Sequence, residues 1–186
     1  MGGCGIWLAA AVVNACLGGA LAAAEGSGAH AFSFTSIEGA ALPLQSFAGH
    51  PILVVNTASM CGFTYQYRAM QRVWDAYRER GLVVLGVPSN DFGRQEPGSA
   101  TEIKKFCEVN FAVDFPLTEK VHVVGESSHP LFAWLRRELG AQAGPRWNFH
   151  KYLIDPQGKV VGAWPSSVEP DAPAIKAAVE LLLPAS

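Results

Sequence analysis

One cysteine of this chain occupies a position that favours reactivity. Cys61 follows the apolar, β-branched run 51–57 and precedes a segment of helical periodicity that opens near Thr64. Sites in parallel α/β sheets form at the carboxyl ends of strands, and the free N–H groups of a helix amino terminus favour a thiolate. Because the thiolate is the reactive form, Cys61 is a candidate nucleophile. From its position alone, the interpretation of Cys61 as a buried structural cysteine is equally well supported.

The other cysteines narrow the possible thiol chemistry. The chain has four cysteines in 186 residues, too few for a disulfide scaffold of this size. Cys61-Gly62-Phe63-Thr64 is not a C-x-x-C motif, so a thioredoxin-type dithiol at one helix end is absent. Cys107 can pair with Cys61 only if the fold brings the two residues together.

Two polar segments accompany Cys61 at the expected site edge. Residues 86–98 form a Gly/Pro-rich loop after a second buried strand, and Gln95 in this loop can donate and accept hydrogen bonds without changing charge. Trp147 and Asn148 precede a hairpin strand and supply N–H donors that could hold a thiolate or a peroxide oxygen. The alternatives are a solubilising role for Gln95 and a core-filling role for Trp147.

Charge and composition exclude several classes of protein. The chain has 14 basic and 16 acidic residues, a formal net charge of −2, and 49% hydrophobic against 16% charged residues. A near-neutral chain is an improbable nucleic-acid binder, and this apolar content is not that of a disordered protein. The length predicts one domain with a core of normal size.

The first segment is predicted to lie outside the fold. Residues 1–24 contain no Asp, Glu, Lys or Arg and end in three alanines, which predicts a signal peptide cleaved after Ala24 and leaves 25–186 as the folded domain. We therefore expect an exported protein, periplasmic in a bacterium. An uncleaved membrane anchor is the first alternative, and a lipoprotein modified at Cys16 is the second.

The remaining chain alternates between strand-like and helix-like patterns. Strand, helix and strand in succession imply a right-handed parallel crossover, and the full order predicts an α/β, thioredoxin-like fold with a central mixed sheet flanked by helices. We expect strands at 51–57 and 82–87, a short edge strand within 31–35, a hairpin of 151–155 with 159–164, and helices at 65–80, from Ser99 or Thr101 through Cys107, at 131–139 and at 172–183.

Three ordered motifs resemble those of the glutathione peroxidase family. They are residues 56–64, 88–98 and 147–149, and the similarity runs from about Phe34 to Leu182. The resemblance implies a thioredoxin-like fold and an antioxidant peroxidase, active in the response to oxidative stress, that reduces hydrogen peroxide and organic hydroperoxides without a metal or an organic cofactor. By position it implies a peroxidatic Cys61 and a catalytic tetrad completed by Gln95, Trp147 and Asn148.

Departures from the family pattern refine this expectation. The nucleophile is Cys61 and not selenocysteine, which implies a slower chemical step. Met60 stands where relatives often carry Lys, and Ser89 replaces a cysteine of many non-selenium members. Cys107 matches the resolving cysteine of thioredoxin-dependent members. The resemblance thus implies a Cys61–Cys107 disulfide reduced by a thioredoxin-like dithiol, formed after local unfolding of the helix that carries Cys107.

Other interpretations stay open at this point. Cys107 can instead be a buried core thiol, and the protein can be a one-cysteine peroxidase that uses glutathione, a peroxide-sensing redox relay, or a binding domain without catalysis. The short stretch 139–147 lacks the insertion that builds tetramers in larger family members, which implies a monomer or weak dimer. No membrane contact is expected unless residues 1–24 are retained.

Overall fold

Two fully buried parallel strands form one half of the main sheet. The computed structural model describes residues 1–2 and 28–184. β3 (Ile52–Thr57) and β4 (Val83–Pro88) pair along their whole length, with every residue buried. Continuous apolar runs such as these are typical of strands covered on both faces. Most of the predicted 1–24 leader, from residue 3 on, lies outside the described residues.

The second half of the sheet is antiparallel. β5 (Lys151–Ile154) pairs with β3 in the opposite direction, and β6 (Val160–Trp164) pairs with β5 as a hairpin. The strand order is β4-β3-β5-β6. The sheet is therefore mixed, as the sequence predicted.

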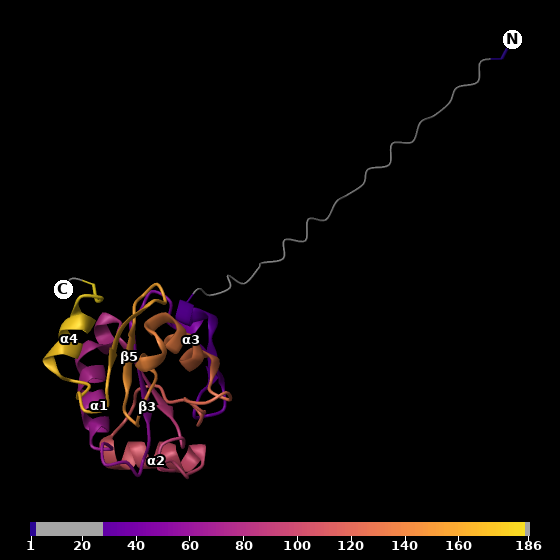
Figure 1. Cartoon of the computed structure of the whole chain (residues 1–186). Helices are drawn as coiled ribbons and strands as arrows, with labels where there is room; N and C mark the ends of the chain where they lie inside the picture. The colour runs from indigo at the N-terminus through magenta and orange to yellow at the C-terminus, as the bar shows by residue number, and fades with distance from the viewer. Residues whose placement is uncertain (3–27, 185–186) are drawn as a thin grey trace.

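Helices cover both faces of this sheet (Figure 1). Leu53 and Val55 of β3 share one buried core with α1 (Gln66–Tyr77), α2 (Ala100–Phe111) and α4 (Pro173–Glu180). Ile52 and Val54, which point the other way, share a second core with α3 (Pro130–Leu139) and the amino-terminal segments. Alternate residues of one strand thus supply two cores. Within the described part of the chain, no helix is long and apolar enough to cross a membrane.

The amino-terminal strand differs from the sequence prediction. β1 (Ser33–Thr35) pairs with β2 (Ala41–Pro43) in a separate two-stranded antiparallel sheet, so it is not an edge strand of the main sheet. β2 was not predicted, because three residues that end in proline carry little strand signal. Short 3₁₀ helices complete the described chain: η1 (Gly28–Ala31), η2 (Leu44–Phe47), η3 (Arg78–Arg80) and η4 (Ala141–Ala143).

Helix α2 begins with a full capping box. The Ser99 hydroxyl accepts the N–H of Glu102, and the Glu102 carboxylate accepts the N–H of Ser99 at 2.8 Å. Ser99, and not Thr101, is therefore the N-cap. The helix extends four residues beyond Cys107, whose side chain lies fully buried in the core. This placement makes α2 the element that controls access to Cys107.

Candidate active site

Cys61 lies in a tight turn between the end of β3 and the start of α1. The N–H of Phe63 points at the Cys61 sulfur at 3.4 Å, and an N–H group in this position stabilises negative charge on sulfur. The Thr64 hydroxyl oxygen accepts the N–H of Cys61 at 3.0 Å and lies 3.0 Å from the carbonyl oxygen of Ala58. The turn is thus fixed at both ends. Cys61 retains 7% of its surface exposed.

Gln95 and Asn148 are joined to each other and to this turn. The Asn148 side-chain amide donates to the Gln95 amide oxygen at 2.9 Å, and the N–H of Met60 donates to the Gln95 carbonyl at 3.0 Å. Because the Gln95 amide oxygen is occupied, its NH₂ group is left as a donor. Asn148 is fully buried, and its own amide oxygen has no partner among the described residues.

Asn56 holds the Trp147–Asn148 segment against β3. Its side chain donates to the Trp147 carbonyl at 3.1 Å and accepts the N–H of His150 at 3.0 Å. Phe149, between them, adopts a left-handed φ of 63°. Trp147 is 39% exposed, with its ring centroid 5.9 Å from that of Phe92. The core-filling alternative for Trp147 is therefore wrong, because more than a third of the residue is exposed.

The loop that carries Gln95 is held by acidic and amide side chains. One Asp91 oxygen accepts the N–H groups of Val123 and Val124 at 2.6 and 3.1 Å, and the other lies 2.6 Å from the His122 ring. Burial opposes ionisation of Asp91, but these hydrogen bonds outweigh it and leave its pKa below the usual value. The loop is thus rigid on the Asp91 side.

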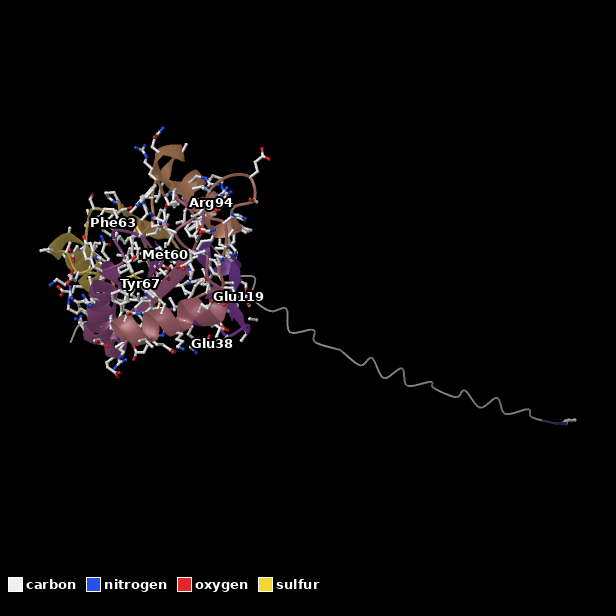
Figure 2. All side chains as sticks on the ribbon, turned by 90° about the horizontal axis from the view of Figure 1, so that it is seen from below. Glu38, Met60, Phe63, Tyr67, Arg94 and Glu119 are labelled. Atoms are coloured by element: carbon white, nitrogen blue, oxygen red, sulfur yellow. The ribbon has the colours of Figure 1, made fainter. Side chains whose placement is uncertain are left out.

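A buried carboxylate ties this loop to the Cys61 turn. Glu96 is 1% exposed, and its carboxylate accepts both the N–H and the hydroxyl of Ser59, at 2.9 and 3.1 Å. Burial raises the pKa of Glu96. Beside it opens a hollow of about 370 Å³ whose lining includes Met60 and Phe106. Met60, Phe63 and Arg94 lie on one side of α2 in Figure 2, and Glu38 lies on the other.

Cys107 is a free thiol in the middle of α2. It belongs to the same buried core as Cys61, and the two cysteines are not bonded to each other. Burial raises the pKa of Cys107 to about 12, although the neighbouring Tyr67 hydroxyl acts in the opposite direction. A buried and protonated thiol is unreactive while α2 stays folded.

The structure links Gln95, Asn148 and the Cys61 turn from three segments, while Trp147 adjoins Asn148 in sequence and Cys107 shares only a buried core with Cys61. Sequence reasoning missed the residues that hold them, which are Asn56, Thr64 and Glu96. The signal was present for Asn56, because it is a polar residue inside an apolar strand sequence. Among the described residues, no cluster of three or more His, Cys, Asp or Glu side chains is placed to hold a metal ion.

Comparison with known proteins gives consistent matches. The family model described as glutathione peroxidase matches residues 29–136. The hydroperoxy fatty acid reductase of Synechocystis is 45% identical over 162 residues, which cover 83% of this chain and 95% of the relative. A glutathione peroxidase-like peroxiredoxin of Schizosaccharomyces pombe is 40% identical over 137 residues, covering 72% of this chain and 86% of the relative.

Solved structures agree with the fold. The crystal structure of Trgpx in apo form superposes with a TM-score of 0.68 at 34% identity, covering 84% of this chain and 95% of the other. A thioredoxin-family thiol:disulfide interchange protein from Chlorobium tepidum gives a TM-score of 0.58 at 17% identity, covering 81% and 92%. The second likeness concerns the fold alone, and it confirms the thioredoxin-like architecture.

Proposed function

The chain belongs to the glutathione peroxidase family and is a peroxidase, and from this premise we propose that it reduces hydroperoxides through the sulfur of Cys61. The observation that carries the proposal is the hydrogen-bond network that joins the Cys61 turn to Gln95 and Asn148. Gln95 contacts both Asn148 and the residue preceding Cys61, so three distant segments meet at one turn. Neutral donors around a thiol suit a reaction in which negative charge moves from sulfur to oxygen.

In the first step the Cys61 thiolate attacks one oxygen of the hydroperoxide. The S–O bond forms as the O–O bond breaks, and the departing alkoxide or hydroxide takes a proton and leaves as alcohol or water. The sulfur is oxidised to a sulfenic acid and the peroxide is reduced by two electrons. The Gln95 NH₂ group, the Trp147 indole N–H and the Asn148 amide act as preorganised donors to the oxygen on which charge develops.

In the second step the Cys107 sulfur attacks the Cys61 sulfenic acid. A disulfide forms and water leaves, with no external oxidant needed. Because Cys107 is fully buried and its pKa is raised to about 12, the step follows local unfolding of α2. An external dithiol then reduces the disulfide by exchange and becomes oxidised in turn.

A thioredoxin-like protein is the proposed reductant. Two observations support it over glutathione: a second cysteine lies in the core shared with Cys61, and the exposed side chain next to the nucleophile is the uncharged Met60. If residues 1–24 direct export as proposed, the reductant is an exported member of the thioredoxin class. We further propose a monomer or weak dimer.

Organic hydroperoxides with an apolar chain are proposed substrates beside hydrogen peroxide. The hollow beside Met60, the residue before Cys61, also has Ile103 and Phe106 in its lining, together with Glu96 and Glu102, and Met60 is 69% exposed. Apolar walls of this kind stabilise an acyl chain by removing it from water. The Synechocystis relative carries a name that specifies fatty acid hydroperoxides.

A coupled assay tests the proposed cycle. Peroxide consumption is followed with thioredoxin and its reductase, or with glutathione, on wild type, Cys61→Ser and Cys107→Ser. We expect Cys61→Ser to be inactive, and Cys107→Ser to complete one turnover but to lose thioredoxin-linked cycling. Equal thioredoxin-linked turnover in Cys107→Ser refutes the resolving step, and faster turnover with glutathione favours the one-cysteine peroxidase. Negligible turnover with a trapped mixed disulfide favours the redox relay.

A further inference from the structure

One charged side chain is enclosed in the central sheet. Lys151 opens β5, where it lies opposite Val55 of β3 and Trp164 of β6, and none of its surface is exposed. In the described part of the chain it forms no ion pair. Removing a cation from water without a counter-ion is costly unless hydrogen bonds satisfy it.

Three oxygen atoms surround the Lys151 ammonium group. It donates to the Gln66 amide oxygen at 2.6 Å, to the Ser166 carbonyl at 3.3 Å, and to the Val168 carbonyl. The Gln66 amide also donates to the Ser166 carbonyl, at 2.7 Å. An ammonium has three N–H donors and a neutral amine only two. The arrangement is therefore complete only when Lys151 carries its proton.

These contacts connect the two halves of the peroxidatic site. Gln66 is the first residue of α1, and its N–H donates at 2.9 Å to the carbonyl of Phe63, the residue whose own N–H faces the Cys61 sulfur. Lys151 itself lies three residues after Asn148 in the same segment of the chain. We propose that Lys151 is a positioning residue, which holds the Cys61 turn and the Asn148 segment in the relative geometry that peroxide cleavage requires. The inference rests on the proposed function of Cys61.

This role makes the geometry of the site depend on pH. Burial lowers the pKa of Lys151 to about 7, while Glu169 acts in the opposite direction. The other groups that face it carry no charge at pH 7: Gln66 on α1, apolar side chains of β3 and β6, backbone carbonyls after β6, and His150, whose pKa burial lowers to about 4. Above neutral pH the lysine loses its third hydrogen bond, and the site loosens.

The test measures the rate of Cys61 oxidation in a single turnover between pH 5.5 and 9. Rapid-quench alkylation followed by mass spectrometry reports the remaining thiol. The variants are Lys151→Met and Gln66→Glu, with Lys159→Met as the matched control because Lys159 is an exposed lysine of the same hairpin. In wild type we expect a descending limb above about pH 7. Lys151→Met should lose this limb and react roughly tenfold to a hundredfold more slowly at pH 6.

Gln66→Glu keeps the inference testable if Lys151→Met does not fold. A carboxylate in place of the amide raises the pKa of Lys151, so the limb should move to higher pH. A folded Lys151→Met with the rate and profile of Lys159→Met, or an unshifted limb in Gln66→Glu, overturns the positioning role. Wild type whose Cys61 is not oxidised by peroxide refutes instead the proposed function, so the two failures are distinguishable.

Discussion

Weakening the start of α2 should accelerate disulfide formation without changing the oxidation of Cys61. At neutral pH the folded Cys107, with its pKa raised to about 12, holds roughly three thousandfold less thiolate than an exposed cysteine with a pKa of about 8.5. Resolution therefore depends on the fraction of molecules in which α2 is open. Ser99→Ala removes the capping box that begins this helix.

The magnitude follows from the energy of the cap. Loss of a serine N-cap costs about 1 kcal/mol, which raises the open fraction about fivefold when α2 opens and closes faster than the disulfide forms. We expect the Cys61–Cys107 disulfide to form about five times faster in Ser99→Ala. The assay is rapid-quench alkylation after one equivalent of peroxide, with separate quantification of the Cys61 sulfenic acid and the disulfide.

A serine far from α2 provides the control. Ser46 has an exposed hydroxyl that donates to the Pro43 carbonyl in the amino-terminal region, so Ser46→Ala should leave both rates unchanged. An unchanged disulfide rate in Ser99→Ala refutes the idea that α2 must open. A changed rate of Cys61 oxidation in that variant shows that the helix cap also shapes the peroxidatic site.

Three further predictions concern the donors, the buried lysine and the sheet. Gln95→Ala and Asn148→Ala should each slow oxidation of Cys61 by about 10²-fold, and normal stopped-flow rates in both would remove them from the site. Between pH 7 and 10.5 the unfolded chain keeps the Lys151 proton while the folded protein has released it. The free energy of unfolding should therefore rise with pH in that window, by roughly 2–3 kcal/mol from pH 7 to 9 relative to Lys151→Met. Unfolding free energies of wild type and Lys151→Met that change in parallel with pH would contradict this. Gly86→Ala places a Cβ 2.5 Å from a leucine methyl group in the core and should cost about 1–3 kcal/mol in urea denaturation, and a wild-type midpoint would show that the core adapts.

Local signals account for most of the fold. The strands β3 and β4 are evident as apolar β-branched runs, and the turn Pro156-Gln157-Gly158 marks the β5–β6 hairpin. The helix predicted at 65–80 consists of α1 and the short η3, and it ends where Gly81 adopts a φ of 102°. The pairing of β1 with β2 could not be predicted from the sequence, because each strand has only three residues and gains its stability from the tertiary contacts around it.

The site was only partly predictable for a related reason. Cys61 was singled out from its position at a strand end, and Gln95, Trp147 and Asn148 from their hydrogen-bonding groups, but their assignment to one catalytic tetrad came only through the family resemblance. The residues that hold them act across long sequence distances. Lys151 and Gln66 lie 85 positions apart, and no local pattern reveals such a pair. A lysine in a strand otherwise made of buried apolar residues was the available signal, and only the tertiary structure shows its partners.

The central claim is that the Cys61 sulfur is the atom that attacks the peroxide. The most direct test treats folded Cys107→Ser with one equivalent of hydrogen peroxide in the presence of dimedone, which traps sulfenic acids, and maps the adduct by peptide mass spectrometry. The account predicts a stoichiometric adduct on Cys61 and none in a Cys61→Ser, Cys107→Ser double variant. The account would be contradicted if peroxide is consumed while Cys61 of the folded protein stays reduced. It would also be contradicted if Cys61 does not react with peroxide at all.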